Sequence, residues 1–270
     1  MMKTATKTRT NRARRRLERS LALQLRTIVK ARLYRSASSR RRLAENYKAA
    51  IRRKLQGVVN ADARAIKRKL RDDTVTATGF QVWIEQYFGD RENATRKAVA
   101  GVFRGLATEA SEMAAAEIKT DPPKDRVSGF AGGASRRFSE QWRRSGGAQL
   151  QRIAADAEAA GEDYREVVSE RVGQWGERRA GKAARRESHG IVNAISRIVF
   201  TAAGYSLIWV TAGDPCPFCD ALNGQRVGGT SAFVGAGKFD PAGAKAPLKV
   251  RRPVLNPPLH DGCVCSIVAG

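Results

Sequence analysis

The sequence predicts a mainly α protein with an extended helical body and a small C-terminal module of short strands and loops. Apolar residues recur at steps of three and four through most of the first 200 residues, which is the period of an amphipathic helix. After Gly204 this period stops, and glycine and proline become frequent between residues 213 and 258. We therefore expect three parts: a basic helical arm over 1–73, a helical body over 74–204 and a loop-rich module over 205–270.

The basic arm is expected to form two helices between Arg14 and about Leu70. A serine-rich segment, 36–39, separates two apolar stripes, and it predicts a break with Ser39 as the cap of the second helix. The stripes consist of Leu17, Leu21, Leu25 and Ile28, and then of Leu43, Tyr47, Ile51, Leu55, Val58, Ile66 and Leu70.

Positive charge is concentrated in the same arm. Residues 1–73 hold 24 Lys and Arg against five Asp and Glu, and the whole chain carries a net charge of +24. Such a block attracts a polyanion in a salt-sensitive manner, and we expect DNA, although an acidic protein or an anionic lipid surface fits the same electrostatics. A merely solvated helix face is the alternative. The candidate contacts are Arg14, Arg15, Arg16, Arg40, Arg41, Arg42, Arg52, Arg53, Lys54, Lys67, Arg68 and Lys69.

The helical body begins after an expected linker at 74–79. Phe80, Trp83 and Tyr87 belong to an aromatic cluster at helical spacing, and core packing is favoured over base stacking because almost no basic residues interleave. Two prolines and several glycines predict a loop or hinge at 120–133. Further helices are expected at 91–119, at 135–159, around the 164–175 stripe and at 179–203.

A strand is expected at 205–211, where the residues are bulky and β-branched. The longest uncharged stretch, Ile198 to Gly213, is 16 residues long. A membrane span needs about 20 apolar residues. We therefore expect a soluble, cytoplasmic chain with no membrane partner.

Two short motifs hold five candidate metal ligands. Cys216 and Cys219 form a CxxC turn, which presents two thiolates to a tetrahedral ion. His260, Cys263 and Cys265 form an HxxCxC segment that offers three donors for the two remaining positions. The preferred set omits Cys263, but Cys263 remains an alternative. One structural zinc ion is the expected metal, because it would hold together a segment too rich in glycine and proline to fold around a core.

Redox and catalytic readings of these motifs compete with a structural site. A thioredoxin-like CxxC stands at the start of a helix, whereas here the sequence pattern typical of a helix ends within one turn after Cys219. A zinc deaminase places Glu two residues after a His, but His189 is followed by Gly190 and Ile191, and HExxH is absent as well. We expect no enzymatic activity, and we interpret His189 as a core or helix-surface residue.

Several motifs follow one another in a specific order over roughly the last 85 residues. They are Ala184-Arg185-x-Glu187, Asn193, Gly204, Trp209, Asp214, Cys216-Pro217-x-Cys219, Leu222-Asn223-Gly224 and Pro257-Pro258-x-His260-x-x-Cys263-x-Cys265. This order resembles the head-morphogenesis domain of phage minor head proteins of the Mu F-like type. Val264 stands where the family typically has Arg, and Arg186 stands where it has Thr; neither is a proposed ligand.

The resemblance implies a non-enzymatic virion component that is present in few copies beside the portal protein and is needed for head assembly. Its expected partners are the portal protein and the major capsid or scaffold protein, with DNA meeting the basic N-terminal region and no small-molecule substrate. The expected location is the virion head, and the host cytoplasm during assembly. The alternative is a nucleic-acid-binding zinc-knuckle protein that acts outside a particle. A zinc hydrolase or nuclease is disfavoured, because no carboxylate cluster or catalytic His is set up for it.

Overall fold

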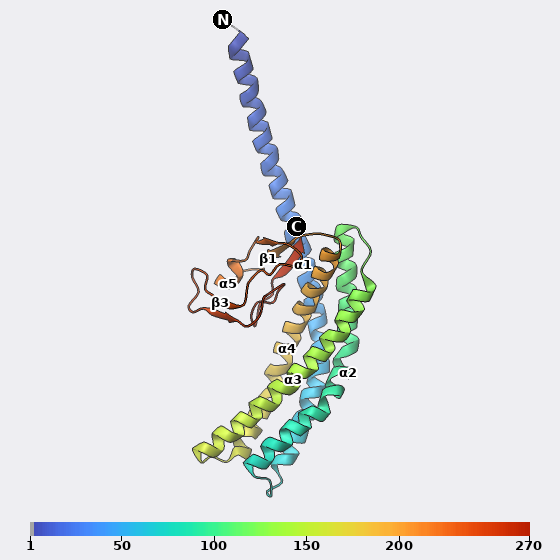
Figure 1. Ribbon diagram of the computed structural model, residues 1–270, viewed down its shortest axis with the longest axis vertical. Coiled ribbons are helices and arrows are strands. Elements are labelled where there is room, and N and C mark those ends of the chain that lie inside the picture. The colour runs from blue at the N-terminus through green and yellow to red at the C-terminus, as the bar shows by residue number, and fades with distance from the viewer. Residues whose placement is uncertain (1–2) are drawn as a thin grey trace.

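The protein is mainly helical, as the sequence predicts (Figure 1). The computed structural model describes the backbone of residues 3–270, and the side chains of residues 24, 27–28, 31–175 and 178–270. Four long helices come first: α1 (Lys3–Leu70), α2 (Ala77–Ile118), α3 (Lys124–Ala160) and α4 (Tyr164–Ala202). The C-terminal module follows, with β1 (Leu207–Val210), α5 (Pro217–Asp220), β2 (Arg226–Val227), β3 (Gly237–Phe239), β4 (Leu248–Val250) and β5 (Ser266–Ala269).

The four long helices pack lengthwise into a bundle, and the N-terminal part of α1 continues beyond it (Figure 1). Apolar side chains from all four helices, including Ile51, Phe103, Leu150 and Val168, are fully buried in one core. Because the segment of α1 from Leu43 to Leu70 contributes to this core, the second half of the expected basic arm is part of the bundle.

The expected break in α1 at 36–39 is wrong, because a single helix runs through these serines. Ser39 Oγ donates to the Arg35 carbonyl, one turn earlier in the same helix. Ser36 Oγ bonds to Glu117 of α2 and accepts from Arg40. A serine whose hydroxyl is satisfied inside a helix does not compete for the helical backbone, so these positions need not end the helix.

The aromatic cluster at the start of α2 is core, as expected. Phe80 and Phe88 are buried, and Trp83 and Tyr87 pack against the same core. Thr76 caps the helix by accepting a hydrogen bond from the Gly79 N–H at 3.1 Å. This is the usual role of a threonine at an N-cap.

The expected loop at 120–133 is too long, since α3 already begins at Lys124. Gly129, Gly132 and Gly133 are helical, although each glycine costs a helix about 1 kcal/mol relative to alanine. The same stretch buries Val127 and Ala131 against the bundle. Burial of this apolar face outweighs the poor helix propensity of the glycines.

The C-terminal module is built on a three-stranded antiparallel sheet in the order β2-β1-β5. Val210 at the end of β1 pairs with Ser266 at the start of β5. Because the strands are antiparallel, this pairing places the segment that leads from Val210 to Cys216 beside the segment that ends at Cys265. A separate antiparallel pair, β3 with β4, extends the module.

The module packs onto the bundle through a continuous core. Trp209 and Ile267 of the sheet are fully buried and belong to the same apolar cluster as the four helices.

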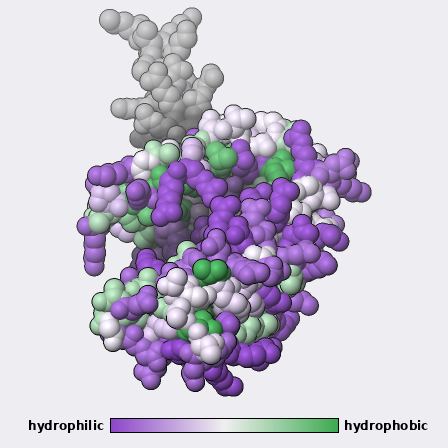
Figure 2. All heavy atoms as spheres, turned by 60° about the horizontal axis from the view of Figure 1, so that its bottom comes forward, coloured by the Kyte–Doolittle hydropathy of each residue, from purple (hydrophilic) through white to green (hydrophobic). Residues whose placement is uncertain are grey.

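The face of the molecule seen in Figure 2 is mostly hydrophilic, with scattered apolar side chains. Among the side chains that the structure describes, the exposed large hydrophobics are Ile28, Tyr34, Val82 and Tyr205. Within the described part of the chain, no helix is both long and apolar enough for a membrane span.

Candidate metal centre

The five candidate ligands, although up to 49 positions apart in the sequence, converge in the C-terminal module. Two overlapping groups form: Cys216, Cys219 and His260 in one, and Cys219, Cys263 and Cys265 in the other. Within each group all donor atoms lie within 4.8 Å of one another. Cys219 belongs to both groups, and it therefore lies at the centre of the cluster.

The CxxC half of the cluster is held by a single helical turn. Pro217 occupies the first position of α5, where its fixed φ suits the start of a helix and its missing N–H costs nothing. The Asp220 N–H donates to the Cys216 carbonyl at 2.9 Å, and the Leu222 N–H donates to the Cys219 carbonyl at 3.1 Å. The turn therefore presents both sulfurs toward the second half of the cluster.

The second half is a tight loop between His260 and Cys263. The Cys263 N–H donates to the His260 carbonyl at 3.2 Å, and Gly262 adopts a φ of 83° that favours glycine. Nδ1 of His260 donates to the Asp261 carbonyl at 2.8 Å, since a carbonyl oxygen can only accept. Nε2, the other ring nitrogen, is turned to the sulfurs of Cys216 and Cys219. Metal-binding histidines are commonly oriented in this way, with one ring nitrogen bonded to a carbonyl and the other facing the ion.

The donor atoms lie close together, and the distance between two of the sulfurs is that expected around a tetrahedral ion. His260 Nε2 lies 3.1 Å from Cys216 Sγ and 3.2 Å from Cys219 Sγ, and the Cys219 and Cys263 sulfurs are 3.7 Å apart. Two thiolates bound about 2.3 Å from one tetrahedral ion lie about 3.8 Å apart. The residues present could therefore hold a metal ion.

The chemistry of the thiols also suits a metal. Cys219, Cys263 and Cys265 are buried, and all four cysteines are free rather than paired in disulfides. The hydrogen bond between the Cys219 thiol and the Cys263 sulfur raises the pKa of Cys219 and lowers the pKa of Cys263. One sulfur is thereby favoured as a thiolate, the form in which cysteine binds metals.

Asn193 of α4 positions the C-terminal end of the cluster. Its Nδ2 donates to the Cys265 carbonyl at 3.1 Å, and its Oδ1 accepts from the Ile267 N–H at 2.9 Å. A third bond joins Nδ2 to the His189 carbonyl of the same helix at 2.8 Å. The buried amide thus fixes the backbone on both sides of Ser266. The sequence alone assigns no contact with the module to Asn193, because its two partners there lie more than 70 residues away.

His189 is a core residue, in agreement with one of its two expected roles. It is buried, and its Nε2 lies 3.2 Å from a Glu45 carboxylate oxygen on α1. It belongs to neither donor group of the described residues. The histidine therefore joins α1 to α4 rather than extending the metal cluster.

The basic candidates of α1 divide by exposure, and Arg40 must be removed from the nucleic-acid set. It is 1% exposed, forms an ion pair with Glu117, donates to Ser196 Oγ at 2.9 Å and lies 4.9 Å from the Phe200 ring centre. Burial lowers the pKa of this arginine, and Glu117 opposes that effect. Arg40 therefore serves as a buried link between α1, α2 and α4.

Among the other basic candidates whose side chains the structure describes, two are half-buried and the rest are exposed. Arg41 is half-buried, and burial lowers its pKa. Lys69 is half-buried and forms an ion pair with Asp72 at 3.2 Å. The exposed candidates are Arg42, Arg52, Arg53, Lys54, Lys67 and Arg68. Arg14, Arg15 and Arg16 lie outside the residues whose side chains the structure describes.

Comparison with known proteins adds no relative from which a role could be transferred. A scan against protein-family models, a search of curated proteins and a search of solved structures each find no match to this chain.

Proposed function

We propose that this chain is a minor head protein of a tailed phage, with a C-terminal module that is held together by one structural zinc ion. The proposal rests on the resemblance of the ordered motifs between Ala184 and Cys265. One observation supports it: the most widely separated of these motifs meet in a single place. Trp209, the CxxC turn and the HxxCxC loop form one module, and Asn193 clamps that module to α4.

Zinc is the proposed ion because of the donor set. Three thiolates with one imidazole, or four thiolates, suit zinc, while oxygen donors would favour magnesium or calcium. Zinc would be held by four of the residues Cys216, Cys219, His260, Cys263 and Cys265, and it would supply folding energy to a module that has few regular elements. The side chains supply enough donors to close the coordination shell without water, which favours a structural role over a catalytic one.

The particle itself provides the test. Full and empty heads would be purified separately and analysed by quantitative mass spectrometry together with the portal and major capsid proteins. Peptides of this chain at low stoichiometry in both kinds of head would support the proposal. Absence from every particle would overturn it.

The alternative function is nucleic-acid binding outside a particle, and the net charge of +24 favours it as the second candidate. The two functions differ in the partners that accompany the protein. A free binding protein would co-purify with nucleic acid from cells that contain no assembling heads.

A further inference from the structure

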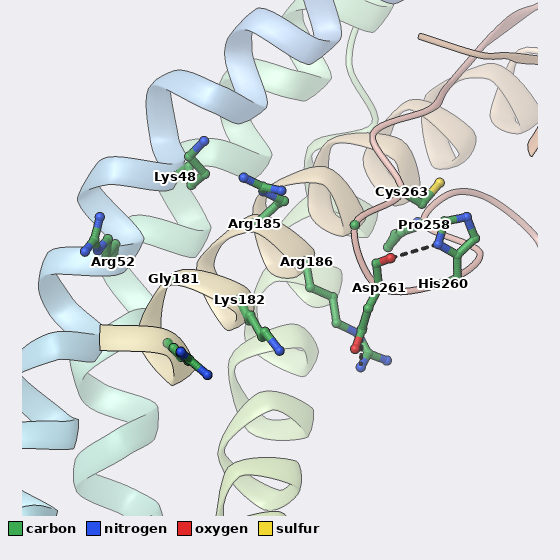
Figure 3. A pocket seen from close by; sticks show the side chains of 12 residues that line it. Lys48, Arg52, Gly181, Lys182, Arg185, Arg186, Pro258, His260, Asp261 and Cys263 are labelled. Atoms are coloured by element: carbon green, nitrogen blue, oxygen red, sulfur yellow. Dashed lines mark hydrogen bonds and ion pairs between the residues drawn. The ribbon is translucent and has the colours of Figure 1, made fainter. Parts of the chain in front are cut away.

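A cleft of about 570 Å³ lies where α1, α4 and the His260–Cys263 loop meet (Figure 3). Six basic residues line it, and four of them are on α4. The six are Lys48, Arg52, Arg178, Lys182, Arg185 and Arg186. Figure 3 shows Lys48 and Arg52 on α1 facing the α4 side chains, with His260, Asp261 and Cys263 on the loop beside them.

The basic residues form two rows along the cleft. Lys48 and Arg52 are four apart on α1, and Arg178, Lys182 and Arg185 are spaced by four and three on α4, so each row follows one helix face. At a rise of 1.5 Å per residue, the rows extend about 6 Å and about 10 Å. An extended ligand could therefore contact several of these charges at once.

The charge in this cleft is nearly uncompensated. Among the described residues that line it, Asp261 is the only acidic one; its side chain is 87% exposed and lies 4.0 Å from Arg186. Lys48 forms an ion pair with Glu45. The other four, Arg52, Arg178, Lys182 and Arg185, have no acidic partner within 4 Å among the side chains that the structure describes. Gathering like charges is unfavourable unless an anion offsets them.

We infer that this cleft binds the phosphodiester backbone of a nucleic acid strand. Four of the six cations are arginines, whose planar guanidinium groups match phosphate oxygens in pairs. No Phe, Tyr or Trp is among the lining residues in the described part of the chain, and the one imidazole, that of His260, lies against the cysteine sulfurs, so bases have no large stacking platform there. Recognition would consequently use the backbone charge, would be independent of base sequence and would weaken steeply with salt.

Most of this site lies outside the basic arm: Lys48 and Arg52 come from the arm, and only Arg52 is among its candidate contacts. The site goes beyond the proposed function because it requires no particle. Its third wall is the metal-binding loop, which includes His260, Gly262 and Cys263. The shape of the cleft is thus coupled to the metal cluster. For this reason the binding experiment uses the whole chain with zinc bound.

The experiment measures fluorescence anisotropy of a labelled strand of about 20 nucleotides, and of the matching duplex, at about 50 to 200 mM NaCl. The test variant combines Arg178→Gln, Lys182→Gln and Arg185→Gln in the cleft. The control combines Lys97→Gln, Arg144→Gln and Arg152→Gln, three exposed positions on α2 and α3 outside the lining. Both variants lose three positive charges, so they differ only in where the charge is removed.

We expect the cleft variant to bind at least about tenfold more weakly and its slope of log K against log salt to fall by about two to three. The control should change affinity by about twofold or less. Lys182→Glu, a single change that places an acid in the cleft, should weaken binding even if the triple variant proves unstable. Circular dichroism and zinc content verify that the variants remain folded.

Equal losses in the cleft and control variants would overturn the inference, because binding would then follow total charge alone. Displacement of the strand from the cleft by polyglutamate of equal charge would overturn it in favour of an acidic protein ligand. Either result is independent of the composition of phage particles, so it leaves the proposed virion role untouched.

Discussion

The side-chain oxygen of Asn193 accepts the backbone N–H of Ile267 at 2.9 Å, and this bond connects α4 to the strand that follows the last cysteine. The same amide donates to the Cys265 carbonyl. A buried side chain that satisfies backbone groups on both sides of one residue determines where the strand begins. Position 193 is thus part of the metal site's support although it donates no ligand.

Replacing Asn193 with alanine should destabilise the protein by about 2 to 4 kcal/mol, because a buried N–H and a buried carbonyl lose their partner. Urea unfolding followed by circular dichroism would measure the loss. Asn60→Ala, at an exposed position on α1, is the control and should change stability by less than about 0.5 kcal/mol. Similar losses of stability in both variants would contradict the proposed role of the Asn193 hydrogen bonds.

Zinc should be present at about one ion per chain in protein purified under reducing conditions, and Cys216→Ser should abolish it. Elemental analysis by inductively coupled plasma mass spectrometry gives the stoichiometry. Removal of the ion by a chelator should lower the melting temperature, because the cluster binds metal only when the module is folded. Ser231→Ala, in the same module, should keep the zinc. A metal-free wild type that melts at the same temperature with added zinc would refute the site.

The choice between Cys263 and Cys265 can also be settled by metal content. Cys263 shares the tight loop with His260, and its sulfur is 3.7 Å from that of Cys219. We therefore expect Cys263→Ser to lose the ion. We expect Cys265→Ser to keep it while lowering stability, since Cys265 is 3% exposed. The reverse result would identify Cys265 as the fourth ligand, as the spacing of the sequence motif first suggested.

Local spacing explains what the sequence could predict. Helices were predictable because apolar residues such as Ile51 and Leu55 recur at the helical period, and both are buried. The convergence of the five candidate ligands was predictable because neither CxxC nor HxxCxC alone offers the four donors that a tetrahedral ion needs. The strand at 205–211 was predictable from its β-branched and aromatic residues, and β1 spans 207–210.

Tertiary partners explain what the sequence could not predict. Arg40, Arg41 and Arg42 are alike in sequence, and Arg40 is buried against partners that are 77 or more positions away, Glu117 among them. The basic cleft could not be predicted either, because its basic residues on α1 and α4 come together only when these two helices pack against each other. Helix continuity at Ser36 depends on the same neighbour, Glu117.

Asp62 should make stability depend on pH. This carboxylate of α1 is 1% exposed and receives bonds from Tyr87, Arg91 and Trp142, while Arg179 adds favourable charge. Burial raises the pKa of Asp62 above its ordinary value, and the bonds from these partners only partly oppose that. The folded state consequently binds a proton more readily than the unfolded state does.

A raised pKa has a definite sign in the linkage between protonation and folding. Stability from protonated Asp62 is present below the ordinary pKa of about 3.9 and is lost as the pH rises through the higher folded value. The difference in unfolding free energy between wild type and Asp62→Asn should therefore move in favour of the wild type as the pH falls through this window. Urea titrations of both proteins at several pH values would measure it. A constant difference would contradict a raised pKa.

Gly146 of α3 lies against Phe88 of α2 and Arg179 of α4. A Cβ at this position would come within 2.8 Å of Phe88 Cζ and 2.9 Å of Arg179 Nη2. Gly146→Ala should therefore destabilise the protein by about 1 to 3 kcal/mol, because an added methyl overpacks a buried contact. Gly173 of α4 is the matched control, since a Cβ there meets no atom within 4 Å. Gly173→Ala should stabilise the protein by about 0.5 to 1 kcal/mol through helix propensity alone. Thermal unfolding of both variants would measure the contrast, and a stabilising Gly146→Ala would show that the two helices can separate there at no cost.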